Sequence, residues 1–352
     1  MTVTLLDLKQ FDGVVDGKPA ALYTLRNASG MVCSITNYGA KIAQLLVPDR
    51  NGQMGDVVLG YDSLEGVMSG SPSMGAFIGR YAGRIGNAAF TLEGVRHQLT
   101  ANNGPHCLHG GIQGSRFRVF DAVQNNPSSV EMRYVFADGE EGFPGTLALG
   151  LMYSLTDANE LVLDYEALAL DKPTVASFTT HAFFNLNGHA SGSVLGHQVT
   201  VFADQQFDMT DDLVATGELL AVAGTRFDFL QSRAINALGE GGYDCCFALN
   251  KPVQNQLTLA AQISAQSSGR TMQVWSTESA MQFYTGLLPN EPLHGGPGKG
   301  GSRYVQQQSL CLEPQGYPNA PNLMHSYPQA ASAVYAPSVS RSGQTLYRFS
   351  IN

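Results

Sequence analysis

The chain has 352 residues, 14% of them charged, and a formal net charge of -9 at pH 7. Acidic residues form no long block, so this balance argues against a nucleic acid or a membrane surface as a partner. No run of about 18 apolar residues occurs, and the first residues, MTVTLLDLKQFDG, lack the basic and apolar regions of a signal peptide. We therefore expect a cytoplasmic protein.

Alternation of apolar and polar residues predicts strands along the whole chain. In residues 130–136, for example, Val130, Met132 and Phe136 share one face, and Glu131 and Arg133 share the other. This pattern is typical of half-buried antiparallel strands. In chain order, strands are expected at residues 31–36, 130–136, 161–167, 197–202, 257–263, 271–275 and 345–351, and the best helical candidate is 63–68.

Turn-forming residues separate these strands, and no linker or internal repeat divides the chain. Turns are predicted at residues 49–52, 125–127, 157–159, 267–269 and 342–343. We expect residues 1–352 to form a single all-β domain, a large antiparallel β-sandwich with few short helices.

A glycine-rich run at residues 294–302 is predicted to be a mobile loop. It is not a phosphate-binding loop, because Leu293 and Gly300 stand where that motif needs Gly and Ser or Thr.

The five cysteines are scattered and odd in number, so reduced, buried thiols are expected rather than a disulfide framework. His106, Cys107 and His109 lie close together, but no Cys-x-x-Cys or His-x-x-x-His pair accompanies them. We expect neither a metal site nor a cofactor.

His181 lies in VASFTTHAFFNL, a segment predicted to be a buried strand. Alternation places Thr179, His181, Phe183 and Asn185 on one face. Such a face suits a sugar, since polar groups bind its hydroxyls and a ring covers its C–H face. The alternative is a core histidine satisfied by a backbone carbonyl.

Glu313 follows an apolar run and precedes Pro314, which favours an extended conformation and a strand end facing a cleft. The reference pKa values of Glu and His, ~4.3 and ~6.5, make Glu313 and His181 a natural base and acid near neutral pH. The alternative for Glu313 is a solvated side chain at a strand end.

Further polar residues stand beside glycines or aromatic residues. Arg80 and Arg84 lie in GRYAGRIGN, and a guanidinium offers several donors to sugar hydroxyls. Asp244 lies in GGYDCCF, and Gln282 in MQFYTG is suited to hydroxyl recognition. Ordinary surface and cross-strand roles remain open for all of them.

In their joint order, these segments resemble the aldose 1-epimerase (galactose mutarotase) family. The resemblance covers nearly the whole chain, and the motifs are highly specific as a set. The matching segments are ITNYGAKIAQLLVPDRNG, DVVLGYDSLE, GRYAGRIGNAAF, NNGPHCLHGG, TTHAFFNLNG, GGYDCCFAL, MQFYTG and CLEPQGYPNAPN.

The resemblance implies a galactose-mutarotase-type β-sandwich with an open sugar cleft. It implies interconversion of the α and β anomers of free hexoses, galactose or glucose, by acid–base ring opening without a cofactor or metal. The expected partner is a small aldose, bound by a monomer or homodimer. By position, Glu313 matches the general base and His181 the general acid, and the sugar-contacting residues match Arg84, His109, Asp244 and Gln282.

Three positions depart from the family pattern. Gly83 stands where many members have Asn, Cys245-Cys246 replaces His-Asn, and Asn319 replaces a common Asp. These departures put the sugar preference in doubt more than the activity.

Three alternative functions are considered. A hexose-6-phosphate 1-epimerase would need a basic cluster, for which only Arg80 and Arg84 are obvious. A non-catalytic carbohydrate-binding protein would not need the Glu/His pair. A glycoside hydrolase would need two carboxylates, such as Asp244 and Glu313.

Overall fold

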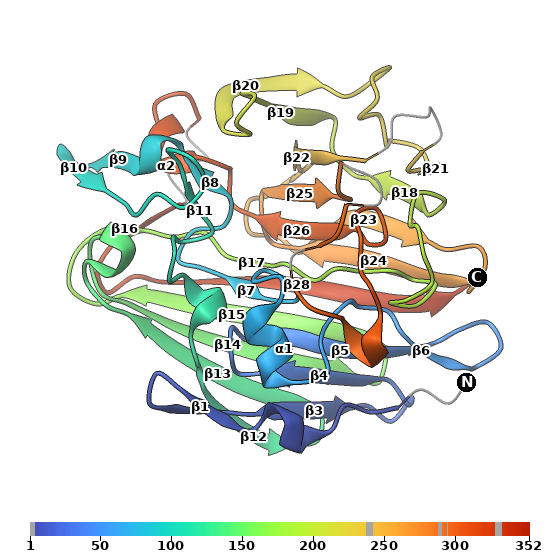
Figure 1. The fold of residues 1–352 in the computed structure, drawn as a ribbon. Helices are drawn as coiled ribbons and strands as arrows, with labels where there is room; N and C mark the ends of the chain where they lie inside the picture. The colour runs from blue at the N-terminus through green and yellow to red at the C-terminus, as the bar shows by residue number, and fades with distance from the viewer. Residues whose placement is uncertain (1–3, 237–241, 288–290, 294, 328–332) are drawn as a thin grey trace.

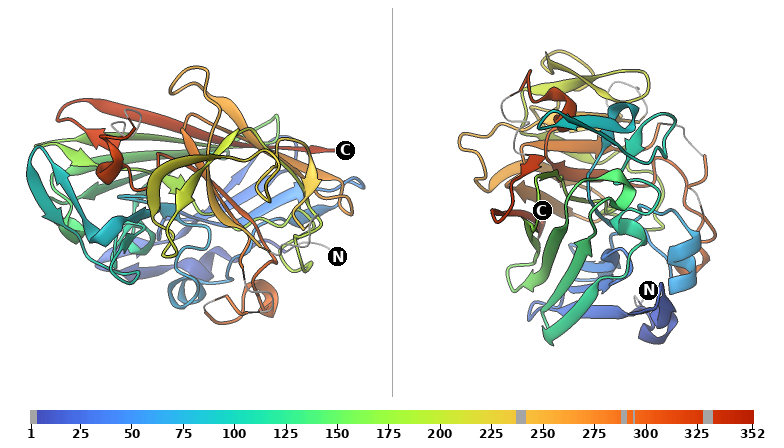
Figure 2. Two further views of the ribbon diagram at one scale, coloured as in Figure 1. Left: turned by 90° about the horizontal axis from the view of Figure 1, so that it is seen from above. Right: turned by 90° about the vertical axis from the view of Figure 1, so that its left-hand side faces the viewer.

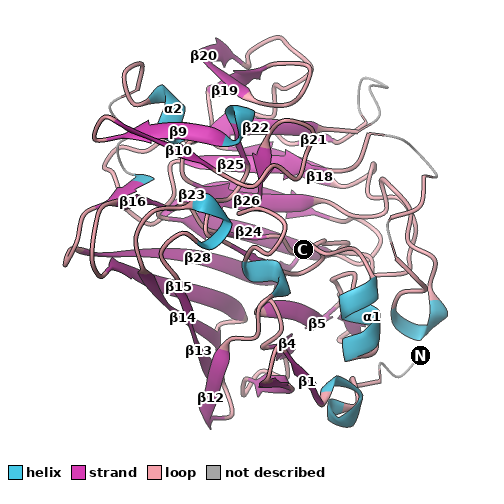
Figure 3. Ribbon diagram, turned by 60° about the vertical axis from the view of Figure 1, so that its left-hand side comes forward, coloured by secondary structure: helices cyan, strands magenta, loops and turns pink. Residues whose placement is uncertain are grey.

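The structure is a computed structural model and describes residues 4–236, 242–287, 291–293, 295–327 and 333–352. Antiparallel strands are its main regular structure, and the described helices are short (Figure 3). Within the described residues, no helix is long and apolar enough to cross a bilayer.

One layer of the molecule is a large antiparallel sheet (Figure 1). Its neighbouring strands join distant parts of the chain: the C-terminal strand, red in Figure 2, pairs with a strand from the middle third. In spatial order the strands are β12 (Asp121–Asn126), β13 (Ser129–Phe136), β14 (Leu147–Thr156), β15 (Glu160–Ala169), β28 (Ser340–Ile351), β24 (Arg270–Ser276), β23 (Thr258–Ser264), β18 (Gln198–Val201) and β21 (Arg233–Ala234).

Two smaller sheets pack against the large one. The first has the order β20 (Ala215–Ala221), β19 (Gln205–Met209), β22 (Asp244–Ala248), β25 (Ala280–Tyr284) and β26 (Cys311–Gln315). The second has the order β3 (Leu22–Arg26), β4 (Val32–Thr36), β5 (Lys41–Pro48) and β6 (Met54–Asp56).

Short elements complete the fold. The strand pairs are β1 (Gly13–Val15) with β2 (Lys18–Ala20), β7 (Phe77–Ile78) with β17 (Thr179–Thr180), β8 (Arg84–Ile85) with β11 (Cys107–Leu108), β9 (Ala89–Leu92) with β10 (Val95–Gln98), and β16 (Thr174–Val175) with β27 (Val334–Tyr335). The α-helices are α1 (Leu64–Ser69) and α2 (Ala320–Leu323), and the 3-10 helices are η1 (Leu8–Phe11), η2 (Gly86–Ala88), η3 (Ser115–Phe117), η4 (Glu140–Gly142) and η5 (Lys299–Gly301).

The core lies between the large sheet and the two smaller ones. Leu151 and Tyr347 of the large sheet, Ile35 of β4 and Phe283 of β25 belong to one buried cluster, and each is at most 2% exposed. Burying one such side chain contributes about 1.5–3 kcal/mol. The expected β-sandwich is therefore confirmed, as are the seven predicted strands, the helix and the five buried, free cysteines.

The predicted turn at Ser342-Gly343 is wrong, because both residues lie inside β28, where Gly343 pairs with Tyr165 of β15. A Cβ atom at Gly343 would lie 2.4 Å from the Tyr165 ring. The glycine makes room for that ring rather than for a change of chain direction.

The glycine-rich run also differs from the expectation. His294 lies outside the described residues, but Lys299 is buried and donates hydrogen bonds to the Asp56 carboxylate (2.6 Å) and to the carbonyls of Val58 and Ala43. These contacts anchor this part of the run to the four-stranded sheet, so it is not the mobile loop that its composition predicts.

Candidate active site

His181 and Glu313 meet although they are 132 positions apart in the chain. His181 Nε2 lies 3.6 Å from Glu313 Oε1, and the two residues are 8% and 2% exposed. The rings of His181 and Phe183 stack with centroids 5.0 Å apart. The expected convergence of carboxylate and imidazole is therefore present.

Both residues differ from the prediction in their local backbone. His181 follows the two-residue strand β17, so the expected long strand is confined to Thr179–Thr180. Glu313 lies inside β26 rather than at its end. Pro314 is tolerated there because β26 is the last strand in the order of the five-stranded sheet, where a missing N–H costs least.

Burial opposes charge on both members of this pair. It raises the pKa of Glu313 well above its usual value, and the negative charge of Asp244 adds to this effect. Burial lowers the pKa of His181 to about 4, and the positive charge of Arg116 acts in the same direction. Both shifts favour the uncharged imidazole and the protonated carboxyl over an ion pair.

Strand register brings Gln282 and Asp244 to the same site. Gln282 of β25 is directly opposite Glu313 of β26, and Asp244 of β22 is opposite Tyr284, two residues further along β25. The Gln282 amide donates to Asp244 Oδ1 at 2.5 Å. Burial raises the pKa of Asp244, while the charge of Arg84 and this hydrogen bond oppose the increase.

Arg84 lies in β8, and His109 directly follows its partner strand β11. The backbone N–H of Gly83 donates to His109 Nδ1 at 3.2 Å, so the neutral ring carries its hydrogen on Nε2. Burial and the charges around it keep the pKa of His109 well below its usual value. Arg84 Nε donates to Asn103 at 2.8 Å.

The six predicted residues form a closed ring of neighbours. The His109 ring lies edge-on to the His181 ring, with centroids 5.4 Å apart, and Arg84 interacts electrostatically with both His109 and Asp244. His181 and Glu313 are buried, whereas the other four are half-buried. The His181–Glu313 pair can exchange protons with a ligand, and the four residues around it can donate or accept hydrogen bonds.

Comparison of the sequence with known proteins identifies the family of this chain. A family model described as Aldose 1-epimerase matches residues 21–332. The chain belongs to the aldose 1-epimerase family. Galactose mutarotase of Bos taurus is 38% identical over 302 residues, which are 84% of this chain and 85% of that protein. Aldose 1-epimerase of Escherichia coli (strain K12) is 34% identical over 315 residues, 87% and 89% of the two chains.

Solved structures agree with this aldose 1-epimerase fold. A GalM/aldose epimerase homologue from C. elegans has a TM-score of 0.86 and 27% identity, covering 94% of this chain and 99% of that one. Galactose 1-epimerase from Lactobacillus acidophilus NCFM has a TM-score of 0.81 at 24% identity, covering 97% of both chains. The enzyme is accordingly an isomerase that interconverts the anomers of an aldose.

The departures from the family pattern lie in different surroundings. Gly83 has a φ of 77°, and a Cβ there would be in ordinary contact with the Gln315 amide. Cys246 pairs with Gln282 across the sheet, and the Gln315 amide approaches its sulfur at 3.8 Å. Asn319 accepts from the N–H of Gly86 and so fixes loop structure. Only the first two departures lie against the site.

Sequence reasoning missed Arg116 and Cys311. Arg116 donates to the carbonyls of His109 (2.7 Å) and Gly111 (3.0 Å), holding the turn in which His109 has a φ of 54°. No sequence pattern signals this role. Cys311 lies two residues before Glu313 on β26, so strand alternation alone could have placed it on the same face.

Arg80 is outside the site. It is 2% exposed, its guanidinium donates to the carbonyls of Pro144 and Gly145, and it lies over the rings of Phe136 and Phe143. These contacts hold the Arg80 guanidinium away from the six residues, so Arg80 is not expected to bind the sugar.

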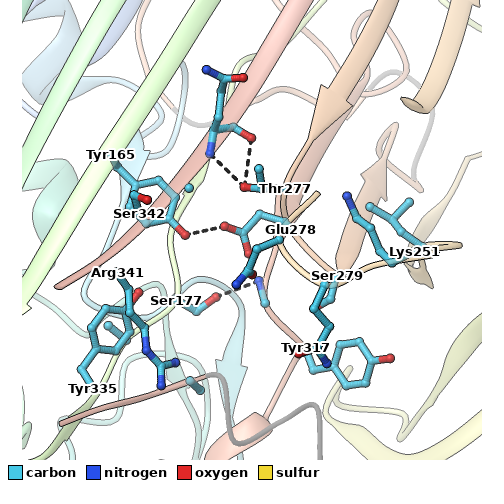
Figure 4. Close-up of a pocket in the computed structure, with 18 of the residues that line it drawn as sticks. Tyr165, Ser177, Lys251, Thr277, Glu278, Ser279, Tyr317, Tyr335, Arg341 and Ser342 are labelled. Atoms are coloured by element: carbon cyan, nitrogen blue, oxygen red, sulfur yellow. Dashed lines mark hydrogen bonds between the residues drawn. The ribbon is translucent and has the colours of Figure 1, made fainter. Parts of the chain in front are cut away.

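A large cavity of about 1010 Å³ lies away from the six residues (Figure 4). We call it the Glu278 cavity. The Tyr165 hydroxyl donates to the Glu278 carboxylate inside it, and Lys251 donates to the carbonyl of Gln256 at 3.2 Å. Other lining residues include Ser177, Tyr317, Tyr335 and Arg341.

Proposed function

We propose that Glu313 and His181 are the acid–base pair that opens and recloses the sugar ring, with Glu313 as general base and His181 as general acid. The 3.6 Å contact between these two buried side chains carries the proposal. A carboxyl and an imidazole at this distance can serve two oxygens of one pyranose.

The reaction begins when Glu313 takes the proton of the O1 hydroxyl and His181 gives a proton to the ring oxygen. The bond between C1 and the ring oxygen breaks, which leaves an aldehyde. Rotation about the C1–C2 bond turns the other face of the aldehyde to the ring oxygen, and the reverse transfers close the ring. Each transfer from a placed group is typically worth ~10²–10⁴ in rate.

The proposed reaction needs one proton on the pair. Burial favours this proton on the carboxyl, because it raises the pKa of Glu313 and lowers that of His181. The two groups titrate as a unit. Sugar hydroxyls that donate to the carboxylate stabilise its charged form, so substrate binding moves this proton to the imidazole.

The half-buried residues of the ring bind the sugar. Arg84 and the Nε2–H of His109 stabilise charge that develops on the ring oxygen. Asp244 and Gln282, already joined by a hydrogen bond, hold the distal hydroxyls so that C1 stays between acid and base.

The proposed substrates are free hexoses, galactose or glucose. The relatives named galactose mutarotase support this choice. A phosphate would need a basic cluster, but the Arg80 guanidinium is enclosed by backbone carbonyls and aromatic rings. Of the two arginines that the sequence offers for a phosphate, only Arg84 is then available, and a single arginine is not a basic cluster.

We further propose that residues 1–352 act as one domain in the cytoplasm, as a monomer or homodimer, without nucleic acid or membrane partners. Five buried, free cysteines support a reducing compartment.

Polarimetry tests the function directly. The protein should accelerate the change of optical rotation of freshly dissolved α-D-galactose and α-D-glucose more than that of glucose 6-phosphate. Binding of these sugars without acceleration would instead identify a non-catalytic carbohydrate-binding protein.

A further inference from the structure

We propose that Cys311, His181 and Glu313 together bind a thiophilic divalent cation such as Zn²⁺, and that this cation inhibits the enzyme. One ligand atom from each of the three residues lies within 4.8 Å of the other two. Among the residues that the structure describes, this is the group of His, Cys, Asp and Glu that is close enough to hold a metal.

Strand geometry explains why a thiol joins the acid–base pair. Cys311 and Glu313 are separated by one residue on β26, so both side chains point to the same face of the five-stranded sheet. Cys311 is fully buried, and His181 and Glu313 are 8% and 2% exposed. The proposed proton transfers do not use the thiol.

The donor set matches zinc better than a hard cation. Zinc accepts thiolate, imidazole and carboxylate ligands at roughly 2.0–2.3 Å in tetrahedral geometry, which places neighbouring ligand atoms roughly 3.3–3.7 Å apart. His181 Nε2 and Glu313 Oε1 are already 3.6 Å apart. Magnesium and calcium prefer oxygen ligands and should not compete.

Binding requires no redox step. The metal bonds to the Cys311 sulfur as the thiol proton leaves to solvent, and any proton on the Glu313 carboxyl is displaced in the same way. His181 Nδ1 is buried and has no hydrogen-bond partner on another of the described residues, so its ring lacks the second interaction that usually fixes a metal-bound imidazole. We therefore infer a reversible inhibitory site rather than a structural one.

Inhibition, but not binding, rests on the proposed function. A cation held by His181 and Glu313 occupies both groups that exchange protons with the sugar. Zn²⁺ should then act competitively with galactose.

The test uses metal-stripped full-length protein. Cd²⁺ titration should produce thiolate-to-metal ultraviolet absorption, and Zn²⁺ should slow mutarotation in polarimetry. Cys311→Ala should remove this absorption and raise the inhibitory Zn²⁺ concentration at least ~10-fold, while metal-free turnover stays near that of the wild type. Cys107→Ala, which removes a buried thiol in another cluster, should leave both signals unchanged.

The proposal is overturned if the wild type shows no such absorption, or if Cys311→Ala keeps the absorption and the zinc sensitivity. Cys311→Ser is the second variant should the alanine protein not fold, with circular dichroism as the check on folding. Because Cd²⁺ absorption does not depend on turnover, failure of the acid–base proposal is recognised separately.

Discussion

The proposed active site and the Glu278 cavity each contain a carboxyl group whose pKa is raised by burial, yet they differ in what surrounds that group. Glu313 has an imidazole 3.6 Å away and hydrogen-bonding residues on the adjacent strand. Glu278 accepts a hydrogen bond from the Tyr165 hydroxyl and feels the positive charge of Lys251.

This difference shows that neither cavity size nor a perturbed carboxyl identifies the catalytic centre. The Glu278 carboxyl has a hydroxyl donor and lies near Lys251, whose pKa is lowered by burial to about 8, but the described residues that line this cavity include no imidazole. The Glu313 carboxyl has an imidazole beside it in His181. Complementary proton donors and acceptors, rather than volume, distinguish the active site.

The largest effect on kcat is expected when each of the two carboxyl groups is replaced by an amide in turn. Glu313→Gln should lower kcat by about 10²–10⁴, because the amide cannot accept the O1 proton. Glu278→Gln should leave kcat unchanged, since it lies outside the ring of six residues. Polarimetry measures both, with melting temperature as the control for folding. Equal losses in the two variants would remove the distinction between the sites.

Removal of the imidazole should have the next largest effect. His181→Gln keeps a polar side chain of similar length but cannot donate a proton readily, so kcat should fall by about 10²–10³. The matched change His109→Gln should lower kcat less, because in the proposed mechanism His109 donates a hydrogen bond to the developing charge but transfers no proton. If His109→Gln proved the more damaging to kcat, the acid would have to be reassigned.

A smaller effect is expected from the residues that hold the sugar. Gln282→Ala removes the donor to Asp244 and a contact to a distal hydroxyl, so KM should rise about 10-fold while kcat changes less. Initial-rate polarimetry over a range of galactose concentrations separates the two constants. A fall in kcat alone, with KM unchanged, would argue against a binding role.

The smallest effect concerns stability. The folded-state pKa of Glu313 lies above its unfolded value, so folded protein binds more protons than unfolded protein as pH rises above ~4.5. Wild-type stability should therefore decrease from this group as pH rises, up to its folded pKa. Glu313→Gln removes that penalty.

Thermal denaturation of both proteins should show the variant gaining in melting temperature relative to the wild type between pH 5 and pH 8, and no such gain near pH 4. The two melting temperatures changing in parallel with pH would contradict a raised pKa for Glu313.

The amino-acid sequence alone determined most of the local structure and named the residues of the proposed site. Alternation specified strands such as β13 and β15, because a two-residue period is a local property of a strand with one buried face. Motif resemblance named all six residues of the ring, including Arg84 and Gln282, although they come from distant segments.

Only the tertiary structure decided which groups are enclosed and by what. Gly343 lies in a strand because the Tyr165 ring packs over it, and Arg80 is removed from the site by carbonyls and rings more than 50 positions away. Lys299 is held by a hydrogen bond to Asp56. The Cys311 thiol lies within 4.8 Å of a ring nitrogen of His181. These contacts join residues far apart in the chain, so no local pattern encodes them, and burial by such partners is what shifts the pKa values on which the chemistry depends.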